Sequence, residues 1–106
     1  MAIHVLDIAQ VREESLESFL RILVEEYVPA ARDRGLRVEG LWRTPAEAGP
    51  PSITVLWSVP SWEDWARARS LASRDPAIAD CARRLRALTV ESSRRFLVAI
   101  DGAATS

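Results

Sequence analysis

The spacing of the apolar residues changes several times along the chain, and the order of these changes limits the folds that it can form. Residues 3–11 (IHVLDIAQV) show mixed alternation and are rich in β-branched side chains, which predicts a strand. From Glu13 the apolar residues recur at helical spacing: Leu16, Phe19, Leu20, Leu23 and Tyr27. We expect this helix to be kinked in its last turn by Pro29 and to end at Gly35, which can adopt a left-handed conformation.

Two further strands and an interrupted helix follow. Residues 36–44 and 53–59 are predicted strands, and the short turn-rich segment between them predicts an antiparallel hairpin. Ser61 and Asp64 have the form of a capping box, so a helix is expected to begin there with Trp62, Trp65, Ala66, Arg69 and Ala72 facing inward. An Asp-Pro pair at 75–76 predicts that a new helix starts, with an apolar stripe that includes Cys81.

A fourth predicted strand at residues 94–101 completes the order β-α-β-β-α-β, which is the ferredoxin-like arrangement. The expected fold is α+β, with a four-stranded antiparallel sheet and helices on one face. We expect one domain at residues 1–101 and a mobile tail at 102–106. The third and fourth strands are apolar on both sides, whereas a sheet with one solvated face should alternate. The open face is therefore expected to pack against a second copy of the chain, giving a homodimer.

Composition excludes several classes of function. No apolar run approaches the roughly 20 residues that span a bilayer, and the start lacks the pattern of a signal peptide. A formal net charge of -1 argues against nucleic acid as a partner, and one cysteine among 106 residues fits a reducing cytoplasm. The single His and single Cys provide no metal-ligand cluster, and no glycine-rich loop could hold a phosphate. We therefore expect no metal, cofactor or membrane partner.

Four segments resemble a known family: ESLESFLRILVEEYVPAARDRG, LRVEGLW, ITVLWSVPSWEDWARAR and DPAIADCARRL. With the spacing of Pro29, Gly40, Trp42 and Trp57, they make the chain similar to NIPSNAP-like members of the dimeric α+β barrel superfamily. The resemblance implies a homodimer whose sheets face each other and a cavity in each subunit between sheet and helices. Relatives in the superfamily include cofactor-independent monooxygenases acting on polycyclic aromatic substrates, polyketide cyclases and haem-degrading enzymes, whereas NIPSNAP-like proteins mostly lack an assigned activity.

Three polar side chains are candidates for chemistry. His4 is the only histidine and could act as a general base, or it could serve at the surface. Tyr27 continues the apolar stripe of the first helix, as a core residue or as a proton donor. Arg69 falls on the predicted inward face, where it would bind a ligand anion, pair with Asp7 or Glu39, or extend to solvent.

The four tryptophans, Trp42, Trp57, Trp62 and Trp65, either fill the core or line an apolar pocket. We therefore expect a small homodimeric NIPSNAP-like protein of unassigned activity that binds a small apolar or aromatic molecule between sheet and helices. The alternative is a cofactor-independent monooxygenase or cyclase acting on a polyketide-like aromatic substrate in bacterial secondary metabolism.

Overall fold

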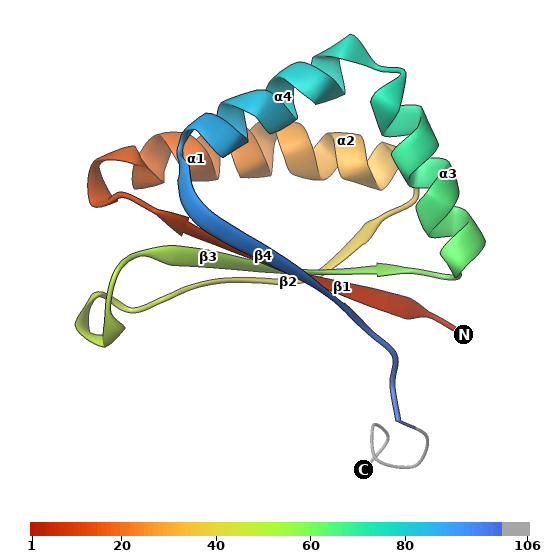
Figure 1. The fold of residues 1–106 in the computed structure, drawn as a ribbon, viewed down its shortest axis with the longest axis horizontal. Helices are drawn as coiled ribbons and strands as arrows, with labels where there is room; N and C mark the ends of the chain where they lie inside the picture. Colours follow the sequence, from red (N-terminus) through yellow and green to blue (C-terminus); the bar gives the residue numbers. More distant parts are fainter. Residues whose placement is uncertain (101–106) are drawn as a thin grey trace.

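A four-stranded antiparallel sheet carries the α-helices of the described residues on one of its faces (Figure 1). The computed structural model describes residues 1–100, so the expected mobile tail at 102–106 lies outside the described residues. The strands are β1 (Ile3–Val11), β2 (Arg37–Arg43), β3 (Ser52–Val59) and β4 (Thr89–Leu97). They lie in the order β2-β3-β1-β4, and β2 and β3 form the expected hairpin. The predicted ferredoxin-like α+β fold is confirmed.

The pairing register decides which side chains face the helices. Val5 of β1 pairs with Trp57 of β3 and with Phe96 of β4, while Asp7 pairs with Arg94 of β4. Since side chains alternate along a strand, the odd-numbered residues of β1 and their partners point to the helical side. The even-numbered residues of β1 point to the open face of the sheet.

The first helical segment is distorted before Pro29, in its middle rather than in its last turn, where we expected the kink. It consists of η1 (Glu13–Ser15), α1 (Leu16–Ile22), the π-helical turn η2 (Leu23–Tyr27) and α2 (Val28–Asp33). Pro29 has no N–H to donate, and just before it the N–H of Val28 bonds to the carbonyl of Leu23 in the wider π pattern. Gly35 ends the segment with a φ of +95°, as expected.

The two later helices begin at the predicted caps. In α3 (Trp62–Ser73) the N–H of Asp64 bonds to Ser61 Oγ at 3.2 Å, and in α4 (Pro76–Ala87) the N–H of Ala77 bonds to Asp75 Oδ1 at 2.9 Å.

The predicted inward face of α3 is partly wrong. Trp65 and Ala72 are half-buried, but Ala68 is the buried residue of α3, and Trp62, Ala66 and Arg69 are exposed. The stripe is rotated by about one residue, because the small side chain of Ala68 packs closely where an arginine could not.

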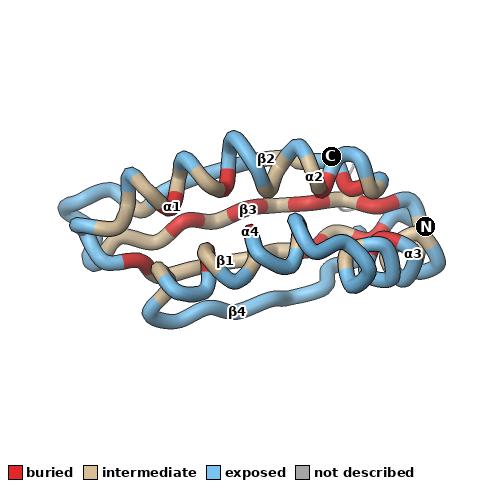
Figure 2. The backbone as a smooth tube through the Cα atoms, turned by 90° about the horizontal axis from the view of Figure 1, so that it is seen from above, coloured by how far each residue is buried: buried red, intermediate tan, exposed pale blue. Residues whose placement is uncertain are grey.

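The predicted bounds of the fourth strand, residues 94–101, are wrong. It begins at Thr89, five residues earlier than expected, and ends at Leu97, while residues 98–100 form no strand. Its first half is polar because β4 is an edge strand, exposed along nearly its whole length (Figure 2). Pairing with β1, from Val11 with Thr89 to His4 with Leu97, defines the strand in place of an apolar pattern.

The hydrophobic core lies between the central strands and the helices, where β3 is buried at every second residue (Figure 2). Its largest fully buried side chain is Trp57, which is 1% exposed. Within residues 1–100, no helix combines the length and the apolar character needed to cross a membrane.

The open face of the sheet, opposite the α-helices, carries apolar side chains. Leu6 of β1 lies opposite Leu56 of β3, and Ile8 is exposed beside them. On β2, the ring of Trp42 lies over Gly40, where an added Cβ would come within 2.0 Å of the ring. The glycine thus leaves the space that the exposed ring of Trp42 occupies.

Candidate functional site

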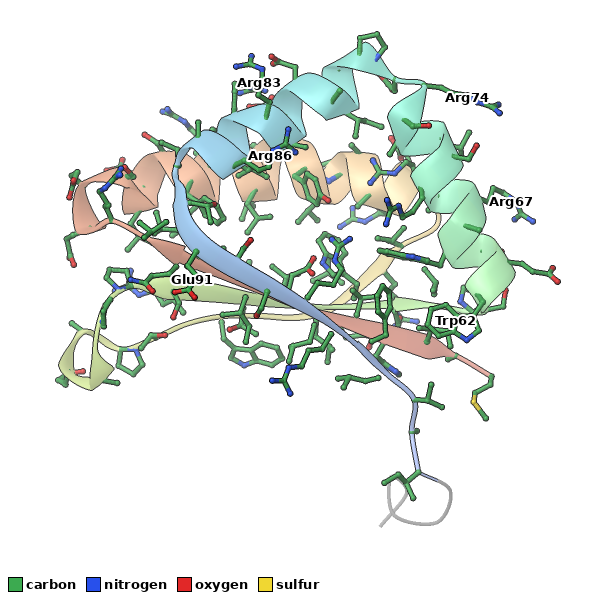
Figure 3. The ribbon with its side chains drawn as sticks, in the orientation of Figure 1. Trp62, Arg67, Arg74, Arg83, Arg86 and Glu91 are labelled. Carbon is green, nitrogen blue, oxygen red and sulfur yellow. The ribbon has the colours of Figure 1, made fainter. Side chains whose placement is uncertain are left out.

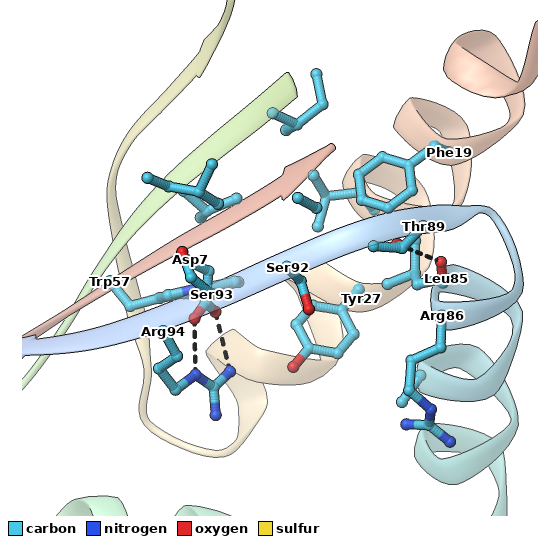
Figure 4. A pocket seen from close by; sticks show the side chains of 16 residues that line it. Asp7, Phe19, Tyr27, Trp57, Leu85, Arg86, Thr89, Ser92, Ser93 and Arg94 are labelled. Atoms are coloured by element: carbon cyan, nitrogen blue, oxygen red, sulfur yellow. Dashed lines mark hydrogen bonds and ion pairs between the residues drawn. The ribbon is translucent and has the colours of Figure 1, made fainter. Parts of the chain in front are cut away.

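A cavity of about 420 Å³ lies between the sheet and the helices (Figure 4). Its floor is formed by β1, β3 and β4, and its walls by α1, η2 and α4. The lining is mostly apolar, with a few polar groups from the sheet: it includes Asp7, Phe19, Leu23, Tyr27, Ile53, Val55, Trp57, Leu85, Ser92 and Arg94.

Asp7 connects three strands at the floor of this cavity. Its carboxylate accepts hydrogen bonds from Trp57 Nε1 at 3.0 Å and from Arg94 Nε and Nη2 at 2.7 and 2.9 Å. The two bonds to the carboxylate raise the pKa of Arg94 above its ordinary value, so the guanidinium stays charged. The guanidinium also lies 5.1 Å from the ring centre of Trp65, a cation–π distance.

The π-helical turn places Tyr27 at the centre of the site. The ring of Tyr27 meets Trp57 edge-to-face, with 5.8 Å between ring centres. Figure 4 shows the phenol between Arg94 and Arg86. The cavity therefore combines two aromatic rings, a hydroxyl and a charged pair.

A second cavity of about 310 Å³ adjoins the first. Both are lined by Tyr27, Trp57, Ala82, Arg86 and Arg94, so these side chains form their common wall. The second cavity extends toward α3, where Trp65, Ala68 and Arg69 line it, and toward the end of α2, where Arg34 does.

A third cavity of about 380 Å³ lies between α2 and α4 and contains Cys81. The thiol is buried, and burial raises its pKa, which keeps it protonated at neutral pH. This agrees with the interpretation of Cys81 as a small apolar residue. No group of three or more His, Cys, Asp or Glu side chains that could hold a metal ion occurs in the described part of the chain.

The structure brings together four of the seven predicted site residues. Tyr27, Trp57, Trp65 and Arg69 line the two adjoining cavities, although Arg69 is exposed rather than buried. It forms no ion pair within residues 1–100, and Asp7, one of its two suggested partners, is bonded to Arg94 instead. Glu39, the other, pairs with Arg37.

The other three predicted residues line none of these cavities. His4 is an even-numbered residue of β1 and lies on the open face of the sheet, with Leu6. Trp42 lies over Gly40 on β2. Trp62 is exposed at the start of α3 and packs against Phe96, with 5.4 Å between ring centres.

Four charged residues of the two cavities were missed as site residues: Asp7, Arg94, Arg86 and Arg34. Asp7 did leave a signal, because its carboxylate interrupts the apolar residues at the odd-numbered positions of IHVLDIAQV. The arginines left none, since the chain has 14 of them and lacks lysine, so no single arginine stands out.

The sheet, the helices on one face and the cavity between them define the class: a ferredoxin-like α+β protein with a pocket between sheet and helices. The fold is similar to that of a NIPSNAP family protein from Agrobacterium tumefaciens, at 22% identity over 96% of each chain, with a TM-score of 0.82. An uncharacterized NIPSNAP domain protein from Burkholderia xenovorans is similar at 19% identity over 96% of this chain and 97% of that chain, with a TM-score of 0.80.

A more distant similarity links the fold to an enzyme. The cofactor-independent oxygenase SnoaB from Streptomyces nogalater shares 17% identity over 92% of each chain, with a TM-score of 0.67. The chain matches no protein-family model and no curated protein. At the level of the fold, the predicted resemblance to NIPSNAP proteins is confirmed.

Proposed function

We propose that this chain is a small NIPSNAP-like, homodimeric cytoplasmic protein that binds a small apolar or aromatic molecule in the cavity between sheet and helices. The observation that carries the proposal is the 420 Å³ cavity whose wall joins the rings of Tyr27 and Trp57 to the Asp7–Arg94 pair. Small-molecule sites in proteins are typically mostly apolar, contain a few fixed polar groups and have volumes of about 300–1,000 Å³.

The aromatic rings favour a planar ligand. Tyr27 and Trp57 already pack edge-to-face, so a flat ring can extend this arrangement inside the cavity. Trp57 is held by its bond to Asp7 and by burial, which fixes one wall before a ligand enters. A wall that is fixed in advance reduces the ordering cost of binding.

The homodimer is proposed from the open face of the sheet. Ile8, Trp42 and Leu97 are 36%, 54% and 41% exposed, and Leu6 and Leu56 lie between them. An apolar sheet face of this kind is stabilised when a second copy covers it.

A second candidate function is a cofactor-independent monooxygenase or cyclase. The structural likeness to the Streptomyces nogalater oxygenase favours it, together with a hydroxyl group inside an apolar cavity. In such an enzyme Tyr27 would transfer a proton and Arg94 would stabilise an enolate or phenolate. His4 would take no part within its own subunit, since it lies on the other face of the sheet.

Filling the cavity tests the proposed function. Ala82 of α4 lines both cavities, so Ala82→Phe should place a ring in the space that the ligand needs. Titration with 2-naphthol, followed by tryptophan fluorescence, should show saturable quenching that Ala82→Phe weakens at least tenfold. Ala87→Phe, an exposed position on the same helix, serves as the matched control and should leave the quenching unchanged.

Equal quenching in Ala82→Phe and in the unchanged protein would contradict binding in this cavity. Turnover of 2-naphthol or a larger polycyclic phenol in air, without added cofactor, would favour the enzyme instead.

A further inference from the structure

The second cavity is lined by four arginines, and in the part of the chain that the structure describes only one of them is paired with a carboxylate. Arg34, Arg69, Arg86 and Arg94 line it, and no acidic side chain among the described residues does. Arg94 is paired with Asp7, which belongs to the lining of the first cavity. Within residues 1–100, the other three arginines form no ion pair.

Arg34 is the most strongly constrained of the three. Its Nε and Nη1 atoms are fully buried, and neither has a hydrogen-bond partner within residues 1–100. A guanidinium remains charged at any physiological pH, and buried donors on a charged group are costly to leave unpaired. Within residues 1–100, the protein therefore supplies no acceptor for these two donor atoms of Arg34.

The carboxylates that line the third cavity with Arg34 do not fill this role. Glu26, Asp33 and Asp75 line the third cavity together with Arg34, but none forms an ion pair with it. Glu26 is bonded to Arg84, and Asp75 Oδ1 accepts the N–H of Ala77 as the cap of α4.

From this arrangement we infer that the ligand carries an anionic group, a carboxylate, which binds to Arg34 with Arg69 and Arg86 nearby. Guanidinium groups match the planar geometry of carboxylates and bind them with two parallel hydrogen bonds. The body of the ligand would then extend past Tyr27 and Trp57 into the more apolar first cavity. The inference rests on the proposed function and narrows the ligand to the class of aromatic carboxylic acids.

A pair of compounds that differ only in charge tests this inference. At pH 7, 2-naphthoate is an anion, whereas 2-naphthamide has nearly the same shape and no charge. Binding to the purified full chain is followed by tryptophan fluorescence. We expect 2-naphthoate to bind at least tenfold more tightly than 2-naphthamide.

Variants locate the carboxylate. Arg34→Gln should remove most of the preference for 2-naphthoate over 2-naphthamide. Arg69→Gln, at an exposed position, should reduce the preference several-fold. Arg74→Gln is the control, because it removes the same charge from a side chain that points away from the fold (Figure 3). It should change neither affinity.

The outcomes separate this inference from the proposed function. Two results would overturn the inference that the ligand is an anion: equal affinity for the two compounds, or an unchanged preference in both Arg34→Gln and Arg69→Gln. Either result would still leave the cavity as a binding site. A lack of binding by both compounds and by 2-naphthol would overturn the proposed function, and this inference with it. If inorganic phosphate binds as tightly as 2-naphthoate, the site binds simple anions. That result would overturn the inference that the ligand is an aromatic carboxylic acid.

Discussion

Asp7 organises the floor of the cavity, because three hydrogen bonds from two neighbouring strands converge on its carboxylate. A charged acceptor makes these bonds stronger than neutral ones. The carboxylate therefore fixes both the ring of Trp57 and the guanidinium of Arg94, and with them the shape of the cavity wall.

Asp7→Asn should lower the free energy of unfolding by about 1–2 kcal/mol, because a neutral amide accepts fewer and weaker bonds. The loss of stability should lie at the lower end of this range, because the side chain of Arg94 is 38% exposed and solvent screens the pair. Urea unfolding measures the change. A double-mutant cycle with Arg94→Gln should give a coupling of about 1 kcal/mol. Purely additive effects in this cycle would contradict the role of the pair.

Residues whose role follows from their own element could be predicted from the sequence. Tyr27 and Cys81 lie on apolar helical stripes, and the structure places them where the period indicates. Asp7 and Arg94 are different, because their roles depend on the register between two strands that are far apart in the chain. Neither composition nor periodicity specifies that register.

Among the elements, the π-helical turn η2 and helix α4 are joined by one arginine. Arg84 of α4 bonds to Glu26 in η2 and to Asp80 in its own helix. Hydrogen bonds from Arg84 to Glu26, and from Arg83 and Arg84 to Asp80, lower the pKa values of both carboxyl groups. Arg84 thus helps to hold α4 beside the turn that carries Tyr27.

The lowered pKa values predict a pH dependence for this contact. A lowered pKa means that the charged form is favoured in the folded state, so the stabilisation is present above the ordinary values of 4.5 and 3.8. It is lost as the pH falls below them. Arg84→Gln should therefore reduce the urea midpoint at pH 7, and the difference from the unchanged protein should shrink steadily below pH 4.5. Arg67→Gln, within an exposed pair on α3, is the control. A difference that stays constant down to pH 3 would contradict the ion pair.

The sequence could specify the elements wherever a cap or a period defines them. The Ser61 and Asp75 caps lie where expected. The start of β4 could not be predicted, because an exposed edge strand needs no apolar alternation. The rotation of α3 about its axis could not be predicted either, since alanines on both sides of the stripe make its phase ambiguous.

In the whole molecule, the sheet separates two apolar regions that serve different purposes in our proposal. The helical side holds the core and the cavities, and the open side holds the proposed dimer surface around Leu6 and Leu56. The sequence indicates strands that are apolar on both faces, but it does not indicate the face on which each tryptophan lies. The assignment of Trp57 to one face and Trp42 to the other comes from the structure.

Leu6→Glu should convert the proposed dimer into a monomer, because it places a charge at the centre of the open face. Within a subunit the new carboxylate would lie beside Arg95, the pairing partner of Leu6 on β4, so the monomer should stay folded. Light scattering after gel filtration measures the mass. Val24→Glu, an exposed apolar position on the helical side, is the control and should leave the mass unchanged. If the protein without substitutions is a monomer, or if the Leu6→Glu variant is a dimer, the open face is not the dimer interface.

The indole N–H signals of the four tryptophans in a ¹H–¹⁵N spectrum test the central claim most directly, with one Trp→Phe variant for each assignment. A planar aromatic ligand such as 2-naphthol, added stepwise, should shift the signals of Trp57 and Trp65, which line the cavities. The signal of Trp42, on the opposite face of the sheet, should stay in place. Unchanged Trp57 and Trp65 signals with a shifted Trp42 signal would contradict a binding site between the sheet and the helices.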